Sequence, residues 1–293
     1  MKLIKQSFEI LDQQCGLEGI YKQIERAGRT CYKSEDKITE DSAKEFVDRM
    51  IKSGHGATLE HGTVYLAMPT ETMIPIEANG WGKYTKNPYS KGFKVCNVNG
   101  QKRVAITTNL RVLVENGWLD DLQYICEPTE YHEKRITVKF TTDQGILREF
   151  TRHRVFSFAV ESTRYCNYTK DKFSNEVTFI QPNWISDEDI ENYHINFNYF
   201  IDQDANHIAA VDRFMSALKG AEYFYMELIR LGWKPQQARN ILPLATKCDM
   251  IMTGFIDDWT HFFELRCDKN AHPQAQELAN QLKESFINRG YIK

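Results

Sequence analysis

An Asn-Gly dipeptide between two strand-like stretches places the strongest single constraint on the fold. Residues 93–98 and 101–107 are apolar and β-branched at alternating positions, and Asn99-Gly100 separates them. A two-residue type I′ turn requires a positive φ at both central positions, which Asn and Gly tolerate. The sequence therefore predicts an antiparallel β-hairpin over residues 93–107.

The other patterned stretches do not follow a strand–helix–strand rhythm. Thr39 is expected to cap the helix 39–53, and Asp143 a short helix that leads to Arg148 and Arg152. Residues 69–92 are rich in Gly, Pro and Asn and predict a loop. Further strands are predicted at 3–11, 63–68, 135–141, 177–181 and 247–253, and further helices at 18–33, 108–126, 187–231, 235–242, 256–267 and 274–288. This order favours an α+β fold with a mixed or antiparallel central sheet flanked by helices.

Composition and charge exclude several classes of protein. The 293 residues are 42 % hydrophobic and 26 % charged, which is typical of a globular chain, and the net charge is −3. A net negative charge argues against a binder that covers nucleic acid with its whole surface. No apolar run is long enough to span a membrane, and the first residues are too polar for a secretion signal. The seven scattered cysteines form no CxxC pair, so we expect reduced thiols, a cytoplasmic protein and no metal site.

The densest group of reactive side chains lies at residues 148–165, which hold four arginines and one histidine. Guanidinium groups bind phosphate through paired, charge-assisted hydrogen bonds, and hydroxyl and N–H groups of Ser162 and Thr163 can face the same anion. Composition alone leaves a solvated, salt-bridged surface equally open. Alternating apolar residues within this stretch, and arginines in apolar settings at Arg239 and Arg266, favour a pocket for a phosphate or nucleotide. Cys166 is the one candidate nucleophile, although a small buried residue is the simpler interpretation.

The segment Arg152-His153-Arg154, followed after seven residues by Ser162, resembles the defining motif of the flavin-dependent thymidylate synthases. Three more segments resemble that family's motifs in the same order, at 55–61, 238–243 and 259–266. The resemblance covers roughly residues 1–68 and 135–290. It implies one catalytic domain over 1–293, with an insertion at about 69–134 that contains the predicted hairpin.

The resemblance also implies a reaction and its partners. The family converts dUMP to dTMP by reductive methylation, with methylenetetrahydrofolate as carbon donor and with FAD, reduced by NADPH, as hydride donor. Its members are homotetramers whose active sites lie at subunit interfaces. We therefore expect these small molecules as ligands, and neither a nucleic acid nor a membrane as a partner.

Site residues follow from the resemblance by position. Arg266 is expected to be catalytic, because the family uses this arginine to favour the N3-deprotonated uracil ring. Residues expected to bind dUMP are Glu149, Arg152, Val160, Glu161, Ser162, Thr163, Arg164, Arg239 and Arg266. Residues expected to bind FAD are Ala57, Arg152, His153, Arg154 and His261.

Structural alternatives stay open for several of these residues. Arg266 can instead pair with Glu264 or Asp268, and His153 can be a buried, hydrogen-bonded histidine. His261 can pack among the aromatic residues of its helix. Glu149 stands where the family often has Gln, and it can face sugar or base, or pair with Arg148 or Arg152.

The chain departs from the family pattern at two places. Ala57 stands where Ser or Thr is common, and residues 159–161 lack the usual Asn-Glu pair, which puts side-chain contacts there in doubt. Two rival functions remain at this point. One is a non-catalytic nucleotide- or RNA-binding module that uses residues 148–165, and the other is a thymidylate synthase with Cys166 as nucleophile.

Overall fold

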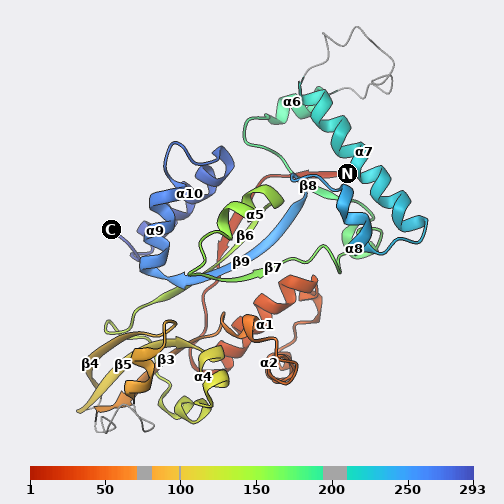
Figure 1. Cartoon of the computed structure of the whole chain (residues 1–293). Helices are drawn as coiled ribbons and strands as arrows, with labels where there is room; N and C mark the ends of the chain where they lie inside the picture. Colours follow the sequence, from red (N-terminus) through yellow and green to blue (C-terminus); the bar gives the residue numbers. More distant parts are fainter. Residues whose placement is uncertain (71–80, 99, 194–209) are drawn as a thin grey trace.

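We analysed a computed structural model of the chain, which describes residues 1–70, 81–98, 100–193 and 210–293. Helices and strands are mixed along the chain, and the strands form sheets of four, three and two strands in the described part (Figure 1). The predicted α+β class is confirmed.

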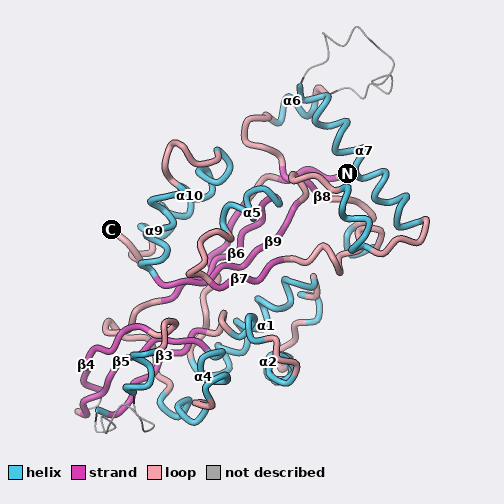
Figure 2. The backbone as a smooth tube through the Cα atoms, in the orientation of Figure 1, coloured by secondary structure: helices cyan, strands magenta, loops and turns pink. Residues whose placement is uncertain are grey.

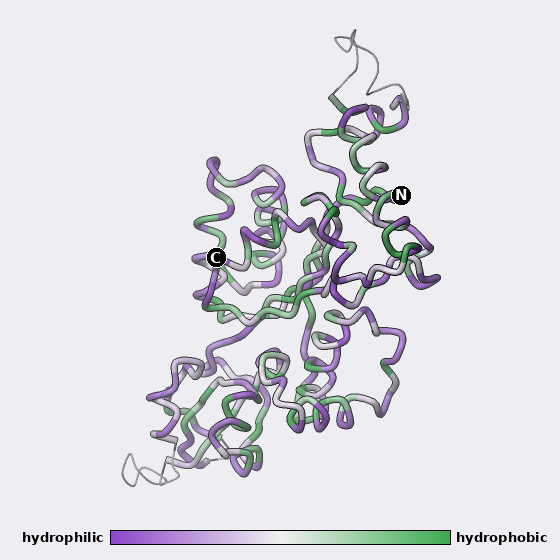
Figure 3. The backbone as a smooth tube through the Cα atoms, turned by 45° about the vertical axis from the view of Figure 1, so that its right-hand side comes forward, coloured by the Kyte–Doolittle hydropathy of each residue, from purple (hydrophilic) through white to green (hydrophobic). Residues whose placement is uncertain are grey.

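The four-stranded central sheet carries the main core. It has the order β2 (Ser7–Ile10), β6 (Arg135–Asp143), β9 (Lys247–Phe255) and β7 (Ser157–Val160), and each neighbouring pair is antiparallel. One face is covered by α5 (Gln144–Phe150), α9 (Ile256–Arg266) and α10 (Pro273–Asn288), and α1 (Gly16–Tyr32) packs on the other (Figure 2). Because helices cover both faces, β9 is buried along nearly its whole length, and Figure 3 shows these central strands as hydrophobic.

The predicted hairpin belongs to a second sheet at the lower left of Figure 1. Its order is β3 (Thr63–Pro69), β5 (Gln101–Asn109) and β4 (Lys91–Val98), and Val98 pairs with Gln101 across the turn, of which Asn99 lies outside the described residues. A second core joins this sheet to α1, α2 (Ser42–Lys52) and α4 (Leu110–Asn116). The short helix α3 (Gly56–Leu59) lies between α2 and β3.

A third unit joins the start of the chain to its C-terminal half. Strand β1 (Lys2–Ile4) pairs in parallel with β8 (Thr178–Ile180). Helices α7 (Ala210–Arg230) and α8 (Pro235–Ala238) pack against this pair around a third core, and α6 (Asp187–Glu191) follows β8. The N-terminus lies beside α7 (Figure 1).

Several predicted elements need correction. The stretch 3–11 forms two strands in different sheets, because the chain leaves β8 after Ile4 and joins β6 at Ser7. Thr39 is not a helix cap, since the second helix begins at Ser42 and the Thr39 N–H donates to the Ser42 hydroxyl.

Other differences concern the ends of predicted helices and loops. The stretch 108–126 is split into α4 and a 3₁₀ helix over Leu119–Tyr124, and 235–242 into α8 and a 3₁₀ turn over Arg239–Ile241. The predicted loop 69–92 contains a 3₁₀ helix at Trp81–Lys86 and the start of β4, and its residues 71–80 lie outside the described residues. The predicted helix 187–231 includes 194–209, which also lie outside the described residues.

Candidate active site

Three residues from two helices and a turn form the most tightly bonded polar cluster at the predicted site. Arg266, at the end of α9, donates from Nη1 to the Glu149 carboxylate at 2.8 Å and from Nη2 to the Glu149 carbonyl at 2.6 Å. Its Nε donates to Nε2 of His153 at 2.9 Å. The Arg266 side chain is 13 % exposed, so the guanidinium is held from three sides in a largely buried position. The alternative pairs of Arg266 with Glu264 or Asp268 are wrong, as are those of Glu149 with Arg148 or Arg152.

Local structure fixes both ends of this cluster. Asp143 caps α5 by accepting the Ile146 N–H at 2.7 Å, as predicted, and this helix ends at Phe150 next to Glu149. The chain then turns back at 151–156, and the Phe156 ring packs directly on Gly254 of β9. A Cβ at position 254 would lie 2.4 Å from this ring. Glycine is therefore required at position 254 for the turn to reach the sheet.

His153 is buried beneath this cluster, which agrees with the structural alternative of a hydrogen-bonded core histidine. It is 8 % exposed, and its ring lies 5.1 Å from the Phe262 ring. Burial, together with the positive charge of Arg266, lowers the pKa of His153 to about 4. The imidazole is therefore neutral near pH 7, and Nε2 accepts the hydrogen bond from Arg266 while Nδ1 carries the proton.

A second polar site, here called the anion pocket, is lined in part by Gln144 and Arg148 of α5. Arg239 donates from Nη1 to the Thr163 hydroxyl at 3.0 Å, although 76 residues separate them in the chain. The cavity has a volume of about 330 Å³. Its lining comprises Gln144, Arg148, Thr163, Arg239, Asn240, Leu242, Pro243, Leu244 and Thr246. Arg148 and Gln144 are functional candidates that sequence reasoning did not select, although Arg148 stands inside the predicted basic stretch.

In the turn after β7, some of the predicted phosphate-binding groups are free to bind a ligand, and others are hydrogen-bonded within the fold. The Ser162 N–H donates to the Cys31 carbonyl at 2.9 Å, so in this conformation that N–H is used within the fold and the predicted anion contact of Ser162 is left to its hydroxyl. Within the described residues, the N–H groups of Thr163 and Arg164 have no hydrogen-bond partner. These two N–H groups can therefore donate to an anion, as can the Thr163 hydroxyl that lines the anion pocket.

The side chains of Glu161 and Val160 are engaged within the fold. Val160 packs on the central core. Glu161 is 4 % exposed and accepts Nζ of Lys247 at 2.8 Å and the Asp249 N–H at 3.0 Å. Lys33 pairs with both Glu161 and Asp249, so the turn is fastened to β9 and to the end of α1 by buried ion pairs.

The charges of this buried cluster stabilise one another. Burial alone would raise the pKa of the Asp249 carboxyl, but the positive charges of Lys247 and Lys33 hold that pKa well below its usual value. Cys166 lies against Glu161 and is 1 % exposed, and burial raises the pKa of its thiol to about 12. A thiol with so high a pKa is not a nucleophile near neutral pH, so Cys166 is a small buried residue of the core.

Comparison with known proteins gives the family. The model of the Thy1 family, described as thymidylate synthase complementing protein, matches residues 128–289, more than half of the chain. The chain belongs to the Thy1 family. The resemblance to flavin-dependent thymidylate synthases is thereby confirmed, and the match includes three of the four motifs that suggested it.

Individual relatives agree with the Thy1 assignment. The chain is 28 % identical over 152 residues to a probable flavin-dependent thymidylate synthase of Paramecium bursaria Chlorella virus 1, and 27 % identical over 153 residues to a flavin-dependent thymidylate synthase of Synechocystis. Each match covers 52 % of this chain and 66 % of the relative, slightly less than two thirds of its length. A solved UMP/dUMP methylase from Streptomyces cacaoi aligns over 98 % of this chain and 93 % of its own, at 16 % identity and a TM-score of 0.43 that is too low to support a conclusion.

In this Thy1 chain, the side chains of the other predicted residues are exposed and form no hydrogen bond or ion pair with one another. Arg152 and Arg154 flank His153, and the Arg154 N–H donates to the Arg152 carbonyl at 3.0 Å. Their side chains are exposed and form no ion pair or hydrogen bond with the described residues. The His261 side chain is 63 % exposed and lies 3.1 Å from the Glu264 carboxylate, so the alternative in which it packs among aromatic residues is wrong. Arg164 is exposed and lies over the Tyr165 ring.

The His-rich segment lies at a separate surface of the Thy1 fold. Ala57 is exposed on α3. The neighbouring His55 lines an open groove of about 640 Å³ whose other charged residues are mostly cationic, including Lys37, Arg49 and Lys170. No helix among the described residues is long and apolar enough to cross a membrane.

Proposed function

We propose that this protein is a flavin-dependent thymidylate synthase, which converts dUMP to dTMP with methylenetetrahydrofolate as carbon donor and with NADPH-reduced FAD as hydride donor. The observation that carries the proposal is the position of α5 between the two polar sites. Arg148 lines the anion pocket, and the next residue, Glu149, binds Arg266. A nucleotide whose phosphate occupies the anion pocket can therefore extend its base toward Arg266.

The anion pocket suits a phosphate monoester. Two guanidinium groups, a threonine hydroxyl and two unpaired N–H groups offer only hydrogen-bond donors to the ligand at this end of the pocket. Arginine keeps its charge at any working pH and matches phosphate oxygens in pairs. We assign the dUMP phosphate to Thr163, Arg164 and Arg239, together with Arg148.

Arg266 is the group that acts on the base. Three of its five N–H groups are used by Glu149 and His153, which leaves one on each terminal nitrogen for a ligand. A guanidinium already fixed in place stabilises negative charge that develops on the uracil ring without further reorganisation. His153 acts as a positioning residue, because its neutral ring accepts the Nε–H of Arg266.

The residues around this cluster fit FAD. The cofactor carries two phosphates, which require positive charge nearby. The side chains of Arg152 and Arg154 have no acidic partner among the described residues, and cations form most of the charged lining of the groove beside His55. We propose that Arg152, His153, Arg154, His261 and the backbone at Ala57 hold it. When bound and reduced, FAD supplies the hydride.

The family's homotetramer and cytoplasmic location are also part of this proposal. Large apolar side chains are exposed at the end of α7, where Tyr223 is 62 %, Phe224 60 % and Leu231 67 % exposed. Exposed apolar residues gathered in one region are typical of a surface that another chain covers. Light scattering on the purified protein tests the expected mass of four chains.

Two experiments test the proposed activity. Protein purified and then denatured should release FAD, and NADPH oxidation should depend on dUMP. The Arg266→Ala variant should lose most turnover while dUMP still binds measurably, because Arg266 stabilises developing charge more than it binds substrate. Unchanged dTMP formation in this variant would remove Arg266 from the chemistry, and protein without flavin would contradict the whole proposal.

A further inference from the structure

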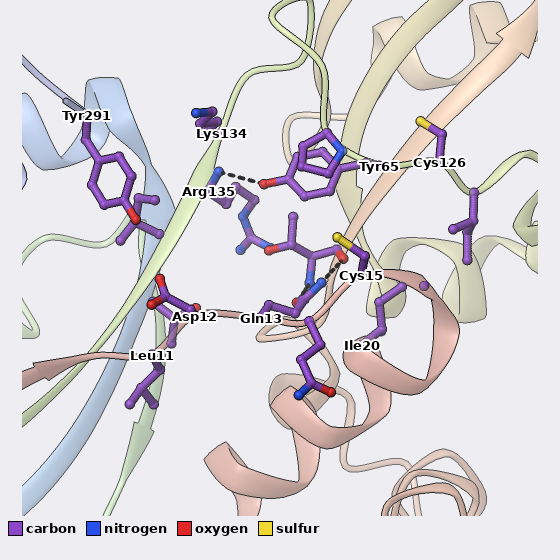
Figure 4. Close-up of a pocket in the computed structure, with 17 residues that line it drawn as sticks. Leu11, Asp12, Gln13, Cys15, Ile20, Tyr65, Cys126, Lys134, Arg135 and Tyr291 are labelled. Carbon is purple, nitrogen blue, oxygen red and sulfur yellow. Dashed lines mark hydrogen bonds between the residues drawn. The ribbon is translucent and has the colours of Figure 1, made fainter. Parts of the chain in front are cut away.

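A further cavity has none of the residues assigned to dUMP and FAD in its lining, and we call it the seam pocket (Figure 4). It has a volume of about 200 Å³ and shares no lining residue with the anion pocket. One wall comes from β6 and from the loop that joins β2 to α1. The rest of the lining includes Ile125 and Cys126 from the predicted insertion 69–134, and Pro128 and Lys134 from the part of that stretch that the Thy1 model also matches.

The cations of the seam pocket lack acidic partners. Arg135 is 9 % exposed, and within the described residues no carboxylate forms an ion pair with it. Its Nη1 donates to the Glu60 carbonyl at 2.9 Å, a neutral acceptor. Burial lowers the pKa of Arg135 to about 10, as expected for a guanidinium that has lost water without gaining a counter-ion. Lys134 beside it is exposed and also has no ion pair to the described residues.

The acidic groups at this pocket are engaged elsewhere. Asp12 accepts Nη1 of Arg289 with both oxygens at 2.9 Å. Glu127, which follows the lining residue Cys126, accepts a hydrogen bond from the Cys15 thiol. The thiol is neutral, so Glu127 keeps its negative charge and offsets one of the two cations. A ligand that enters the seam pocket therefore meets a net positive charge.

Hydrogen-bond donors and apolar surface then define the ligand. The Tyr65 hydroxyl accepts the Arg135 N–H at 3.5 Å, which leaves its own proton free to be donated, and burial raises the pKa of Tyr65 so that this proton is retained. Figure 4 shows Tyr65 beside Lys134 and Arg135, with Tyr291 on the other side of β6. Four aliphatic residues, Leu11, Ile20, Ile125 and Ile136, contribute apolar surface to the rest of the lining. The cavity is smaller than the roughly 300–1,000 Å³ of pockets for drug-sized ligands.

We propose that the seam pocket binds a small aromatic carboxylate, whose acid group meets Lys134 and the Tyr65 hydroxyl and whose ring lies against the apolar lining. A ligand with one ring and one acid group matches the volume of the seam pocket, its hydrogen-bond donors and its net positive charge. The predicted insertion then has a defined role, because it contributes lining residues to a ligand site that is separate from the proposed active site.

Benzoate is the probe for this site. We expect saturable binding of benzoate to the full-length protein in saturation-transfer NMR, at least about ten-fold tighter than neutral benzyl alcohol. Lys134→Ala and Tyr65→Phe should each weaken binding about five-fold, the loss of one hydrogen bond. The matched control is Lys102→Ala, which removes the same charge from an exposed position of β5 that does not line the pocket.

Three outcomes would overturn the proposal. These are no saturable benzoate binding, equal binding of benzyl alcohol, and equal effects of Lys134→Ala and Lys102→Ala. Benzoate binding should also persist with saturating dUMP, and displacement by dUMP would place benzoate in the anion pocket instead. Because the Lys134 and Lys102 variants are read out by binding alone, the result does not depend on whether the chain has thymidylate synthase activity.

Discussion

His153 should make the folded protein sensitive to mild acid, and the His153→Gln variant should remove this sensitivity. The imidazole is buried between Phe156 and Phe262, and it accepts the Arg266 Nε–H in its neutral form. Protonation removes that acceptor and places a second positive charge beside the guanidinium. A glutamine oxygen at position 153 can still accept the same hydrogen bond but cannot titrate.

The size of the effect follows from the two pKa values of His153. The pKa is about 4 in the folded chain and 6.5 when the residue is solvated. Between these values the unfolded state binds more protons, so stability is complete above the unfolded pKa and is lost as the pH falls toward the folded pKa. Lowering the pH from about 7 to about 5 should cost the wild type about 2 kcal/mol through this one group.

Urea unfolding followed by tryptophan fluorescence measures this loss, at one protomer concentration and at both pH values. Other titrating groups contribute equally to both proteins, so the wild type should lose about 2 kcal/mol more than His153→Gln. Equal losses in the two proteins would refute the assigned burial and tautomer of His153. In the Arg266→Ala variant, NMR titration should show the pKa of His153 shifted upward, because a neighbouring positive charge is gone.

Three further changes test the rest of the site. We expect Thr163→Val and Arg239→Ala each to weaken dUMP binding about ten-fold in calorimetry. The double mutant should lose less binding free energy than the sum of the two single losses, because the two side chains share a hydrogen bond. Fully additive losses would contradict a joint site. Gly254→Ala should destabilise the fold by about 1–3 kcal/mol, since the new Cβ overlaps the Phe156 ring, and a thermal unfolding curve like that of wild type would show that the ring moves freely. Glu161→Gln should cost about 3 kcal/mol in urea unfolding by leaving buried lysines undercompensated, and unchanged stability would mean that the ion cluster is dispensable.

Features encoded by neighbouring residues could be predicted from the sequence. The hairpin 93–107 follows from one dipeptide, and the start of α5 follows from Asp143, whose carboxylate can reach the N–H three residues later. Both depend on backbone geometry within a few residues. The prediction failed at Thr39 because the helix begins three residues later, at Ser42, with no side chain capping it; the Ser42 hydroxyl instead accepts the Thr39 N–H.

Contacts between distant segments could not be predicted without the family resemblance. Arg266 and Glu149 are 117 residues apart, and Glu161 meets Lys247 across 86 residues. Nothing in the local pattern distinguishes these carboxylates from solvated ones. The seam pocket was missed for the same reason, because its lining comes from residues 11–20, 63–65, 125–137 and 291, which are far apart in the sequence.

Glu149 holds the Arg266 guanidinium in a fixed position in the single chain, before any ligand binds. A guanidinium that is 13 % exposed needs a counter-charge, and the Glu149 carboxylate supplies it while remaining 40 % exposed, so little desolvation opposes the pair. The Glu149 carbonyl and neutral His153 fix the plane of the group without adding charge. Two N–H groups of Arg266 therefore stay available in a defined direction before any nucleotide binds, and less ordering remains to be done when one does.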